Sequence, residues 1–541
     1  MSHADPDARD LDVPVARAGA ETDPSRAARG LPEPRTAAQP PYPSYEYRLD
    51  LERIRFSSYF SRLSAVTQVV PQGNVGPVLH NRLTHSIKVT AVAREIAVTL
   101  ANDSGERGDA IRELGGIEPV VVQAAASAHD LGHPPFGHLG EHTLDRLART
   151  RLDLPEGFEG NAQTFRILTG LDTNEHAKNG LNLTAATRAA VLKYPWTRFA
   201  WREEREDFRE STPAERPRGI GDDPQDGAAK FSAYALHAAE MAEVRRAYPG
   251  LGPWQQTLEC SVMDIADDIA YSVHDLDDFY RTGVLQQVAV SSELRSWLRD
   301  GAALGTLELP ELSRSGRTPG HALERLWRSV LAKDPWIADR DAFQSAVLRV
   351  SEELGDGLLA TPYDGSTETD RAIATFTRSW IDRLQHAIIV DRDPGIRSGH
   401  IRLDTQAWHD VQVLKFVHSR FVLDRPDLAT AQRGQGRVLE VLVSGFSAWL
   451  SDPIDAARAP RRLRESVEHA IDEYRALEHL PSELHGHEFT LSPDRLVRRA
   501  TGRAIVDYVA SLSDAQAASL ARTISGALPV GLGEELTGTV L

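Results

Sequence analysis

The sequence predicts an all-α protein. Across most of the chain, apolar residues recur at intervals of three and four, which is the spacing of one buried helix face. The alternation of apolar and polar residues that marks a half-buried strand is scarce. The sequence also has no glycine-rich phosphate loop, no serine nucleophile elbow and no internal repeat. We therefore expect a protein built from packed helices.

Length and composition indicate a large globular chain. At roughly 150 residues per domain, 541 residues correspond to about three lobes, or to one domain with large extensions. The apolar fraction of 41% and the charged fraction of 26% are ordinary for globular proteins. The 61 basic and 78 acidic residues give a net charge of −17, which argues against general affinity for nucleic acid. Local lysines and a metal ion can still create a site for a polyanion.

Cysteine usage and the N-terminus bear on the compartment. Cys260 is the only cysteine, so an intramolecular disulfide and a cysteine-based zinc site are both excluded. The N-terminus has no apolar run of the signal-peptide type, and no stretch approaches roughly 18 uninterrupted apolar residues. We expect a cytoplasmic protein with no membrane span.

Taken in order, the chain begins with a polar tail. Residues 1–44 are rich in Ala, Pro, Asp and Arg and are expected to be disordered. Residues 202–229 are charged and rich in Pro, Gly and Asp, which favours a mobile surface insertion. Residues 286–541 are expected to supply packing, pocket walls and oligomer contacts. Helices are expected over 53–63, 80–102, 118–128, from shortly after 135, and over 160–170, 183–194, 254–281, 321–332, 340–354, 367–390, 406–423, 429–451, 460–479 and 491–523.

The densest cluster of chemically active side chains is at residues 127–142. Four histidines and two carboxylates fall within fourteen positions. The adjacent pair His129-Asp130 comes where Gly132 and Pro134-Pro135 end a buried helix, so both side chains can reach one ion. The alternative is a cluster of polar loop histidines that holds no ion.

A second informative segment is the helix expected over 254–281. Asp264, Asp267, Asp268, Tyr271, Asp275 and Asp278 lie on one arc of roughly 100°, opposite a face of Ile, Val and Leu. No lysine or arginine occurs between Met263 and Tyr280 to relieve the repulsion, which favours a bound cation over a solvated acidic face.

Four of these side chains form a candidate ligand set: His85, His129, Asp130 and Asp267. Two imidazoles and two carboxylates suit Mn²⁺, our preferred ion, or Fe²⁺, with Mg²⁺, Zn²⁺ and Ni²⁺ as alternatives. Such a centre can activate water and polarise a phosphoryl group.

The order of these residues resembles the HD-domain metal-dependent phosphohydrolases, and more closely the bacterial dGTPase-like deoxynucleotide triphosphohydrolases, which are related to the vertebrate SAM-and-HD-domain dNTPase. The motif resemblance covers residues 45–285. The blocks that carry it are His80-Asn81-Arg82-Leu83-Thr84-His85-Ser86, His129 to His138, Asn161-Ala162-Gln163-Thr164, Leu192-Lys193-Tyr194-Pro195-Trp196 and Ala266-Asp267-Asp268-Ile269-Ala270-Tyr271.

The resemblance implies an HD-domain helical core with an additional C-terminal helical region, and hydrolysis of a dNTP at the α-phosphorus to deoxynucleoside and tripolyphosphate. It implies His85, His129, Asp130 and Asp267 as metal ligands, with Asp267 preferred to Asp268. It further implies sugar contacts from Gln68, Tyr271 and Asp275, and phosphate contacts from Arg82, Asn161, Lys193, Tyr194 and Lys230.

For proton transfer, the resemblance favours His138 with Glu141 one turn later, and His133 as a phosphate contact or a support for the ligands. Many relatives have a histidine where this chain has Gly160, which places more weight on His138 and Glu141. Simpler interpretations also exist: Lys193 could lie at an ordinary helix end, His142 could serve packing or face solvent, and His80 could be a loop residue without a role.

Two other functions remain open from the sequence. One is an HD phosphodiesterase or nucleotidase acting on another nucleotide, and the other is a nucleotide-binding regulatory oligomer. The expected partners are a dNTP substrate, further copies of the chain in a tetramer or hexamer, and an allosteric nucleotide. The sequence does not decide whether a local basic patch binds nucleic acid. It also does not show which base is preferred.

Overall fold

The computed structural model describes residues 23–33, 43–69, 79–204, 210–221, 227–314, 318–477 and 491–527. Over these residues the protein is all-α, as predicted, and β structure is confined to one two-stranded antiparallel sheet and three isolated bridges. The sheet pairs β1 (Ile388–Val390) with β2 (Ile401–Leu403). None of the described helices combines the length and the apolarity that crossing a membrane requires.

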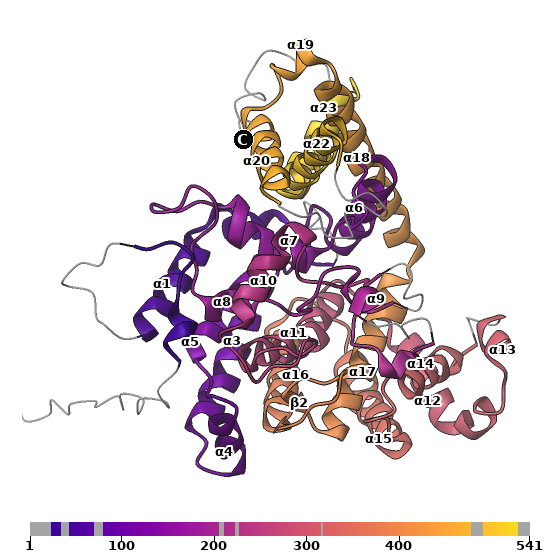
Figure 1. The fold of residues 1–541 in the computed structure, drawn as a ribbon. Helices are drawn as coiled ribbons and strands as arrows, with labels where there is room; N and C mark the ends of the chain where they lie inside the picture. Colours follow the sequence, from indigo (N-terminus) through magenta and orange to yellow (C-terminus); the bar gives the residue numbers. More distant parts are fainter. Residues whose placement is uncertain are drawn as a thin grey trace, which may run out of the picture.

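The histidine motif is framed by helices from the first half of the chain (Figure 1). They are α1 (Pro43–Phe56), α2 (Ser58–Arg62), α3 (Arg82–Asn102), α5 (Pro119–Ala128), α6 (Gly137–Arg151), α7 (Gly160–Arg166), α8 (Ala185–Ala190) and α11 (Leu258–Arg281). The helices that follow in the same body are α14 (His321–Lys333), α15 (Arg340–Val350), α16 (Thr367–His386) and α17 (Thr405–His418).

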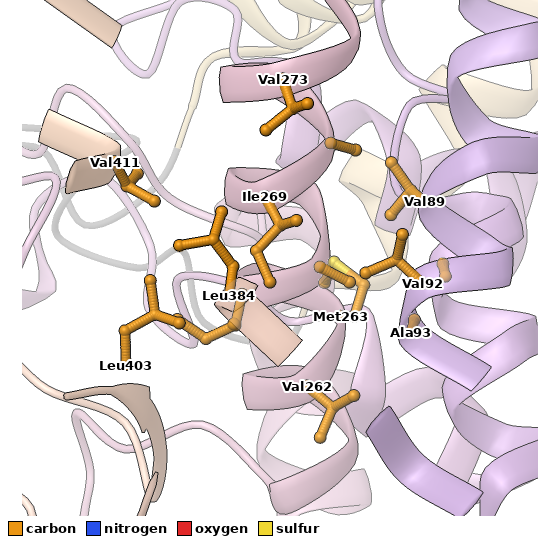
Figure 2. Close-up of a cluster of buried hydrophobic side chains, with 14 of the residues drawn as sticks. Val89, Val92, Ala93, Val262, Met263, Ile269, Val273, Leu384, Leu403 and Val411 are labelled. Atoms are coloured by element: carbon orange, nitrogen blue, oxygen red, sulfur yellow. The ribbon is translucent and has the colours of Figure 1, made fainter. Parts of the chain in front are cut away.

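One hydrophobic core runs from Tyr47 on α1 to Val422, just beyond α17. The boundary expected near residue 285 therefore does not separate two cores. Figure 2 shows its centre, where α11 lies between α3 on one side and α16, α17 and β2 on the other. The side chains shown are Val89, Val92 and Ala93 from α3, Val262, Met263, Ile269 and Val273 from α11, and Leu384, Leu403 and Val411 from the other side. Each valine, leucine, isoleucine or methionine among them contributes about 1.5–3 kcal/mol on full burial, so the core fixes α3 against α11.

The C-terminal lobe, residues 426–477 and 491–527, packs around a second hydrophobic cluster, which it shares with α6. Figure 1 shows the long α18 leading from the main body to this lobe. Leu439 and Phe446 of α18 pack in one buried cluster with Leu144 and Leu147 of α6 and with Val506. Because α6 belongs to the histidine motif, the lobe packs directly on a helix of the candidate site. Its helices are α18 (Pro426–Ser451), α19 (Pro453–Ala456), α20 (Arg461–Ala476), α22 (Pro493–Ala510) and α23 (Asp514–Ile524).

Several expected helices have different bounds. The segment 53–63 is divided between α1 and α2 at Ser57, which is extended and caps α2 through the Tyr59 amide. The segment 491–523 is divided between α22 and α23 at Ser513, whose side chain caps α23. The helix expected over 367–390 ends at His386, because the β-branched run Ile388–Val390 pairs as a strand with β2 instead. The helix expected over 183–194 is the shorter α8.

Other helices were not expected from the sequence. The shortest of them have too few turns to show a clear apolar period. They are α4 (Glu106–Glu113), α9 (Ala200–Glu204), α10 (Ala238–Arg245), α12 (Gln287–Leu304) and α13 (Leu309–Arg314).

Part of the expected disordered tail is ordered. In residues 23–33, the Arg29 guanidinium lies 3.0 Å from Glu46 and 2.6 Å from Asp50 of α1. Arg26 lies over the Tyr248 ring, 4.4 Å from its centre. The expectation of disorder is therefore wrong for this piece, because two arginines supply specific partners that composition does not reveal. Residues 1–22 and 34–42 lie outside the described residues.

Described parts of the expected mobile insertion are also packed on the core. Arg216 is buried and donates to Ser211, and Arg218 donates to Asp264 of α11 at 2.6 Å. Residues 210–221 are therefore anchored to α11 by a specific contact, and the mobility of the insertion stays a prediction. Residues 205–209 and 222–226 lie outside the described part of the chain.

Candidate metal centre

The first candidate ligand is set by the start of α3. Asn81 caps this helix by accepting a hydrogen bond from the Thr84 amide at 3.0 Å, and the Thr84 hydroxyl accepts one from the Asn81 amide at 3.1 Å. Such a reciprocal cap fixes where a helix begins. It places Arg82 and His85, one turn apart, with both side chains buried.

The second candidate ligand stands at the end of α5. This helix is lined with valine and alanine and is buried nearly throughout. His129 Nδ1 lies 2.8 Å from the carbonyl oxygen of Ala126. Because that carbonyl only accepts, Nδ1 carries the proton and Nε2 is left with its lone pair. His129 Nε2 is buried and makes no hydrogen bond, as expected of an atom reserved for an ion.

The turn after His129 is held from behind by neighbouring elements. Thr164 of α7 accepts from the Gly132 amide at 2.9 Å and donates to the His129 carbonyl at 3.2 Å. A Cβ on Gly132 would lie only 2.0 Å from the Gly160 carbonyl oxygen, so only glycine fits there. Arg62 donates to the carbonyls of Leu131 and His133 at 3.0 and 2.7 Å.

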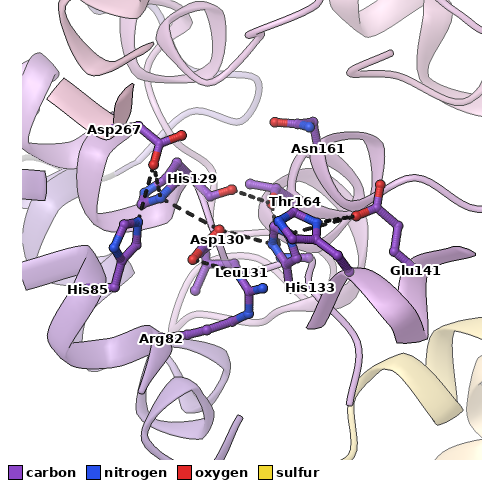
Figure 3. Close-up of polar contacts among 12 residues, drawn as sticks. Arg82, His85, His129, Asp130, Leu131, His133, Glu141, Asn161, Thr164 and Asp267 are labelled. Atoms are coloured by element: carbon purple, nitrogen blue, oxygen red, sulfur yellow. Dashed lines mark hydrogen bonds and ion pairs between the residues drawn. The ribbon is translucent and has the colours of Figure 1, made fainter. Parts of the chain in front are cut away.

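The third candidate ligand comes from α11. Asp267 Oδ1 lies 3.2 Å from His85 Nε2 and 3.7 Å from His129 Nε2 (Figure 3). Its second oxygen, Oδ2, accepts from Lys193 at 2.9 Å. Burial opposes ionisation, but Lys193 and both histidines outweigh it and hold the pKa of Asp267 well below its usual range. The carboxylate is therefore charged, as a ligand must be.

Asp130, the fourth expected ligand, has a different environment. Its Oδ2 accepts from Arg82 at 2.8 Å, and its Oδ1 lies 3.0 Å from His133 Nδ1 and 3.6 Å from His129 Nε2. Burial opposes ionisation, but Arg82 first, then His133 and His129, hold the pKa of Asp130 well below its usual range. Asp130 thus borders the three other candidates through His129 alone.

A second cluster lies on the other side of Asp130. His133 Nε2 and His138 Nδ1 lie 3.8 and 3.3 Å from Glu141 Oε2. Burial and the nearby Arg82 charge lower the pKa of His133 to about 4, so this imidazole is neutral near pH 7. A Cβ on Gly160 would lie 3.5 Å from the His133 ring, so Gly160 is the residue against which this ring packs.

The expected phosphate contacts divide into two groups. Arg82 has two guanidinium nitrogens, Nε and one terminal nitrogen, that are buried without hydrogen-bond partners. Lys193 contacts Asp267 and also Asp264, at 2.8 Å. Lys230 likewise lies between two carboxylates, Glu141 and Glu159, and Asn161 donates from Nδ2 to Glu159 at 2.8 Å.

Tyr194 completes this set beside a cavity of about 280 Å³ that Lys193 also lines. Burial, opposed in part by Lys193, raises the pKa of the Tyr194 phenol, so it stays a neutral hydroxyl near pH 7. The cavity wall carries five basic side chains, Lys193, Arg218, Arg397, Arg402 and Lys415, together with three aspartates, Asp264, Asp268 and Asp334.

The acidic stripe of α11 is compensated by cations from other parts of the chain. Asp264 pairs with Lys193 and Arg218, and Asp268 pairs with Lys415 of α17 at 2.7 Å. Lys193 also pairs with Asp267, so the absence of cations within α11 does not by itself favour a metal ion. What distinguishes Asp267 from Asp264 and Asp268 is that it faces two histidines.

The residues expected to read the sugar carry unpaired polar atoms. Gln68 Oε1 and Asp275 Oδ2 are both buried without hydrogen-bond partners. The Tyr271 ring packs on His418 of α17, with 4.7 Å between ring centres. Burial and the neighbouring Asp278 raise the pKa of Asp275 well above its usual range, which suits a group that awaits a polar partner.

The geometry fits a divalent cation. His85, His129 and Asp267 each offer one ligand atom, and these atoms lie within 4.8 Å of one another. Atoms bound to one ion at about 2.1 Å stand at such distances. Two imidazole nitrogens and a carboxylate oxygen suit Mn²⁺, Fe²⁺ or Zn²⁺. His133, His138 and Glu141 also lie within this spacing, but His138 is exposed.

Sequence reasoning missed two supports of the site. Asp514, the first residue of α23, accepts from the Phe136 amide at 2.8 Å and from the Thr67 amide at 3.0 Å. Arg62 joins the same turn to the Leu512 carbonyl of the C-terminal lobe at 3.0 Å. No local pattern marks either residue, because each acts on segments far away in the sequence.

Comparison with known proteins agrees with this geometry. Residues 82–177 match the family described as HD domain. A protein of Streptomyces coelicolor named deoxyguanosinetriphosphate triphosphohydrolase-like protein is 30% identical over 518 residues, which cover 93% of this chain and 97% of that protein. Proteins of the same name from Shewanella sp. (strain ANA-3) and Shewanella pealeana are 30% and 29% identical, covering 75% and 88% of this chain and 81% and 90% of their own lengths.

Proposed function

Because the chain belongs to the deoxyguanosinetriphosphate triphosphohydrolase-like family of HD-domain phosphohydrolases, we propose that it hydrolyses deoxynucleoside triphosphates. The bond broken is the ester between the 5′-oxygen and the α-phosphorus. Water supplies the oxygen that the phosphorus gains, and the products are deoxynucleoside and tripolyphosphate. dGTP or several dNTPs are the substrates.

One observation carries this proposal. Asp267, Tyr271 and Asp275 follow one another at intervals of four residues on α11, so a candidate metal ligand stands in line with two candidate sugar contacts. A tyrosine ring beside the sugar leaves no room for a 2′-hydroxyl, and the unpaired Asp275 oxygen can accept from the 3′-hydroxyl. A nucleotidase that also accepts ribonucleotides would not need a ring that excludes the 2′-hydroxyl.

The residues around Asp267 suit a polyphosphate. His85, His129 and Asp267 would hold the ion, with Asp130 beside them. A bound divalent ion supplies Lewis-acid polarisation of a phosphoryl oxygen and a more acidic water. Arg82 would bind the phosphates through its unpaired guanidinium nitrogens, and Lys193 and Tyr194 would extend the binding surface along the cavity that they line.

Proton transfer falls to His138 and Glu141. His138 is exposed and can reach the leaving 5′-oxygen, while the buried Glu141 carboxylate, 3.3 Å from its Nδ1, sets the ring orientation and stabilises the imidazolium. Burial opposes ionisation of Glu141, but Lys230 and both histidines hold its pKa well below the usual range. Glu141 is therefore charged and can stabilise an imidazolium at His138, which we assign as the donor of the proton that the 5′-oxygen receives.

The test is a panel of the four dNTPs with Mn²⁺, with and without a second dNTP. Anion-exchange chromatography should show tripolyphosphate and the deoxynucleoside in equal amounts, and a chelator should abolish both. Release of pyrophosphate or orthophosphate would refute the reaction type. The second dNTP also tests the predicted allosteric nucleotide. Two further expectations remain predictions. They are assembly into a tetramer or hexamer and a cytoplasmic location.

A further inference from the structure

His80 holds the segment before α3 against α11. Its backbone amide donates to Asp278 Oδ2 at 2.9 Å, and its Nδ1 lies 2.7 Å from Asp278 Oδ1. Asp278 is buried, so both oxygens of one buried carboxylate face a single residue. The interpretation of His80 as a loop residue without a role is therefore not what its surroundings favour.

Lys88 approaches the same imidazole from α3. Its Nζ contacts His80 Nε2, so the ring lies between a carboxylate of α11 and an ammonium group of α3. Contacts to charged groups are shorter and stronger than those between neutral groups. The His80 ring is thus fixed through both of its nitrogens, and it joins the two helices that carry the candidate ligands His85 and Asp267.

The residues next to His80 pair with the segment that carries Gln68. Asn81 forms an isolated antiparallel bridge with Thr67, and the Arg82 amide donates to the Val66 carbonyl at 3.2 Å. Gln68 follows Thr67 directly. A contact that fixes residues 80–82 on α11 therefore also fixes where the Gln68 side chain begins.

The other end of this contact lies beside Asp275. Asp278 follows Asp275 by three residues on α11, so the two side chains are neighbours on one helix face. Gln68 Oε1 and Asp275 Oδ2 are both buried without hydrogen-bond partners. The contact between His80 and Asp278 therefore connects the segment of one candidate sugar contact to the helix of the other.

We propose that His80 and Asp278 are positioning residues that keep Gln68 and Asp275 at a fixed separation, so that both can bond the 3′-hydroxyl of the sugar. The inference rests on the proposed function for the roles of Gln68 and Asp275. Two buried polar groups held in place for one hydroxyl reject a sugar that lacks it, because both are then left unpaired. A Gln68 free to shift can find another partner, and the rejection weakens.

The test compares dGTP with 2′,3′-dideoxy-GTP. Wild-type protein should prefer dGTP in kcat/KM by about a hundredfold or more. Asp278→Asn should reduce this preference by about tenfold or more, because kcat/KM falls for dGTP and changes by less than about threefold for the dideoxy analogue. His80→Ala should reduce it less, since the backbone hydrogen bond to Asp278 remains.

A merely structural role predicts a different result, in which kcat/KM for both substrates falls by the same factor. An undiminished preference for dGTP in folded Asp278→Asn and His80→Ala would therefore overturn the inference. Circular dichroism establishes folding. If Asp278→Asn does not fold, His80→Ala and Lys88→Met decide, because Lys88→Met removes only the contact to His80 Nε2 and should also reduce the preference.

The matched control is Asp277→Asn. Asp277 precedes Asp278 on α11 but accepts from Arg281 at 2.6 Å, so its change should leave the preference for dGTP unaltered. Calorimetry should show unchanged Mn²⁺ affinity in every folded variant, because none of the altered residues is a candidate ligand.

The two proposals fail separately. If wild-type protein releases a product other than tripolyphosphate, the proposed function fails, and the preference is still measured on that reaction. If wild-type protein releases tripolyphosphate from dGTP and from the dideoxy analogue equally well, the proposed function stands and the inference is overturned. Wild-type protein that hydrolyses no nucleotide would overturn both.

Discussion

At the scale of single residues, the buried carboxylates of the site divide their two oxygens between different partners. In Asp130, Asp267 and Glu141, one oxygen faces a lysine or arginine and the other faces an imidazole. The cation keeps each carboxylate ionised despite burial, and the free oxygen is aimed at a histidine. Replacing any of these carboxylates by the amide of the same shape, Asn or Gln, would remove both the charge and the paired use of its two oxygens.

Asp267 and Asp268 offer a matched pair for testing the metal centre. Asp267→Asn should weaken Mn²⁺ binding by at least tenfold and abolish hydrolysis, because it removes the charged oxygen that faces two histidines. Asp268→Asn changes an equal charge one position later, where the partner is Lys415. Calorimetry with Mn²⁺ should show near-normal affinity for Asp268→Asn. Equal losses in the two variants would disprove the ligand role of Asp267.

Tyr271 governs the choice of sugar in the proposed reaction. Tyr271→Ala should raise kcat/KM for ribonucleotides relative to deoxynucleotides by about tenfold or more, since the ring no longer excludes the 2′-hydroxyl. The measurement is direct competition between dGTP and GTP. His418→Phe serves as control, because it keeps an aromatic ring against Tyr271 and should preserve the discrimination. An unchanged ratio for Tyr271→Ala would remove this residue from sugar recognition.

Local sequence patterns identified the histidines but not their charged neighbours. The ends of α3 and α5 are marked by a cap and by a Gly-Pro-Pro break, and these place His85 and His129 correctly at helix termini. Lys193, Arg218 and Lys415 reach the acidic stripe of α11 from more than forty residues away in the chain. Such pairing depends on tertiary packing, which the period of apolar residues does not encode.

At the scale of elements, the turn between α5 and α6 is held by parts of the chain that lie far from it in sequence. Arg62 of α2 donates to the carbonyls of Leu131 and His133, Thr164 of α7 accepts from the Gly132 amide, and Asp514 of α23 accepts from the Phe136 amide. Phe136 itself has a positive φ of 68°, which is strained for a residue with a side chain. The surrounding helices therefore impose the turn that brings His138 to the site.

Asp514 should matter to both stability and activity. In Asp514→Asn, the side-chain amide group would oppose either the Phe136 or the Thr67 amide and leave that partly buried donor unpaired, at a cost of about 1–3 kcal/mol. Gln68 and His138 lie one and two residues beyond these contacts, so kcat should fall as well. Urea unfolding and steady-state kinetics measure the two effects.

The control for this prediction is Asp494→Asn. Asp494 is also a first-turn aspartate, on α22, but it is exposed, and its change should stay within about 0.5 kcal/mol. If the two variants are equally stable and equally active, the C-terminal lobe does not support the turn.

The ends of several helices also depend on local caps and distant contacts rather than on the apolar period. The polar caps Ser57 and Ser513 each divide an apolar pattern that continues on both sides, so periodicity alone joined α1 to α2 and α22 to α23. The run Ile388–Val390 is apolar enough to extend α16, and only its pairing with Ile401–Leu403 makes it a strand. All-α architecture is thus predictable from the chain, whereas these boundaries depend on contacts made after folding.

At the scale of the whole molecule, the main body and the C-terminal lobe meet at a buried charged network. Arg166 of α7 is fully buried and lies 2.8 Å from Glu473 of α20 and 2.9 Å from Asp507 of α22. It also lies 2.9 Å from His237 Nε2. Burial and the Arg166 charge lower the pKa of His237 to about 4, so the ring is a neutral acceptor near pH 7. One guanidinium therefore satisfies two acids of the lobe.

Arg166→Met should uncouple the lobe from the main body. It leaves Glu473 and Asp507 as buried charges without their cation, which costs about 3–5 kcal/mol. Arg383→Met, which breaks the half-exposed pair with Glu353, should cost about 0–1 kcal/mol. Trp449 on α18 is the tryptophan of the C-terminal lobe, since the others precede residue 409. Fluorescence with and without Trp449→Phe therefore reports the lobe separately during urea unfolding.

In the Arg166→Met variant, the Trp449 signal should change at lower urea than the signal of the main body, giving two transitions in place of one. Because Asp514 and Arg62 join the lobe to the turn before His138, activity should disappear with the first of these transitions. Activity that persists until the second transition would show that the main body forms the site unaided. A single transition at the wild-type midpoint would show that the network does not hold the two parts together.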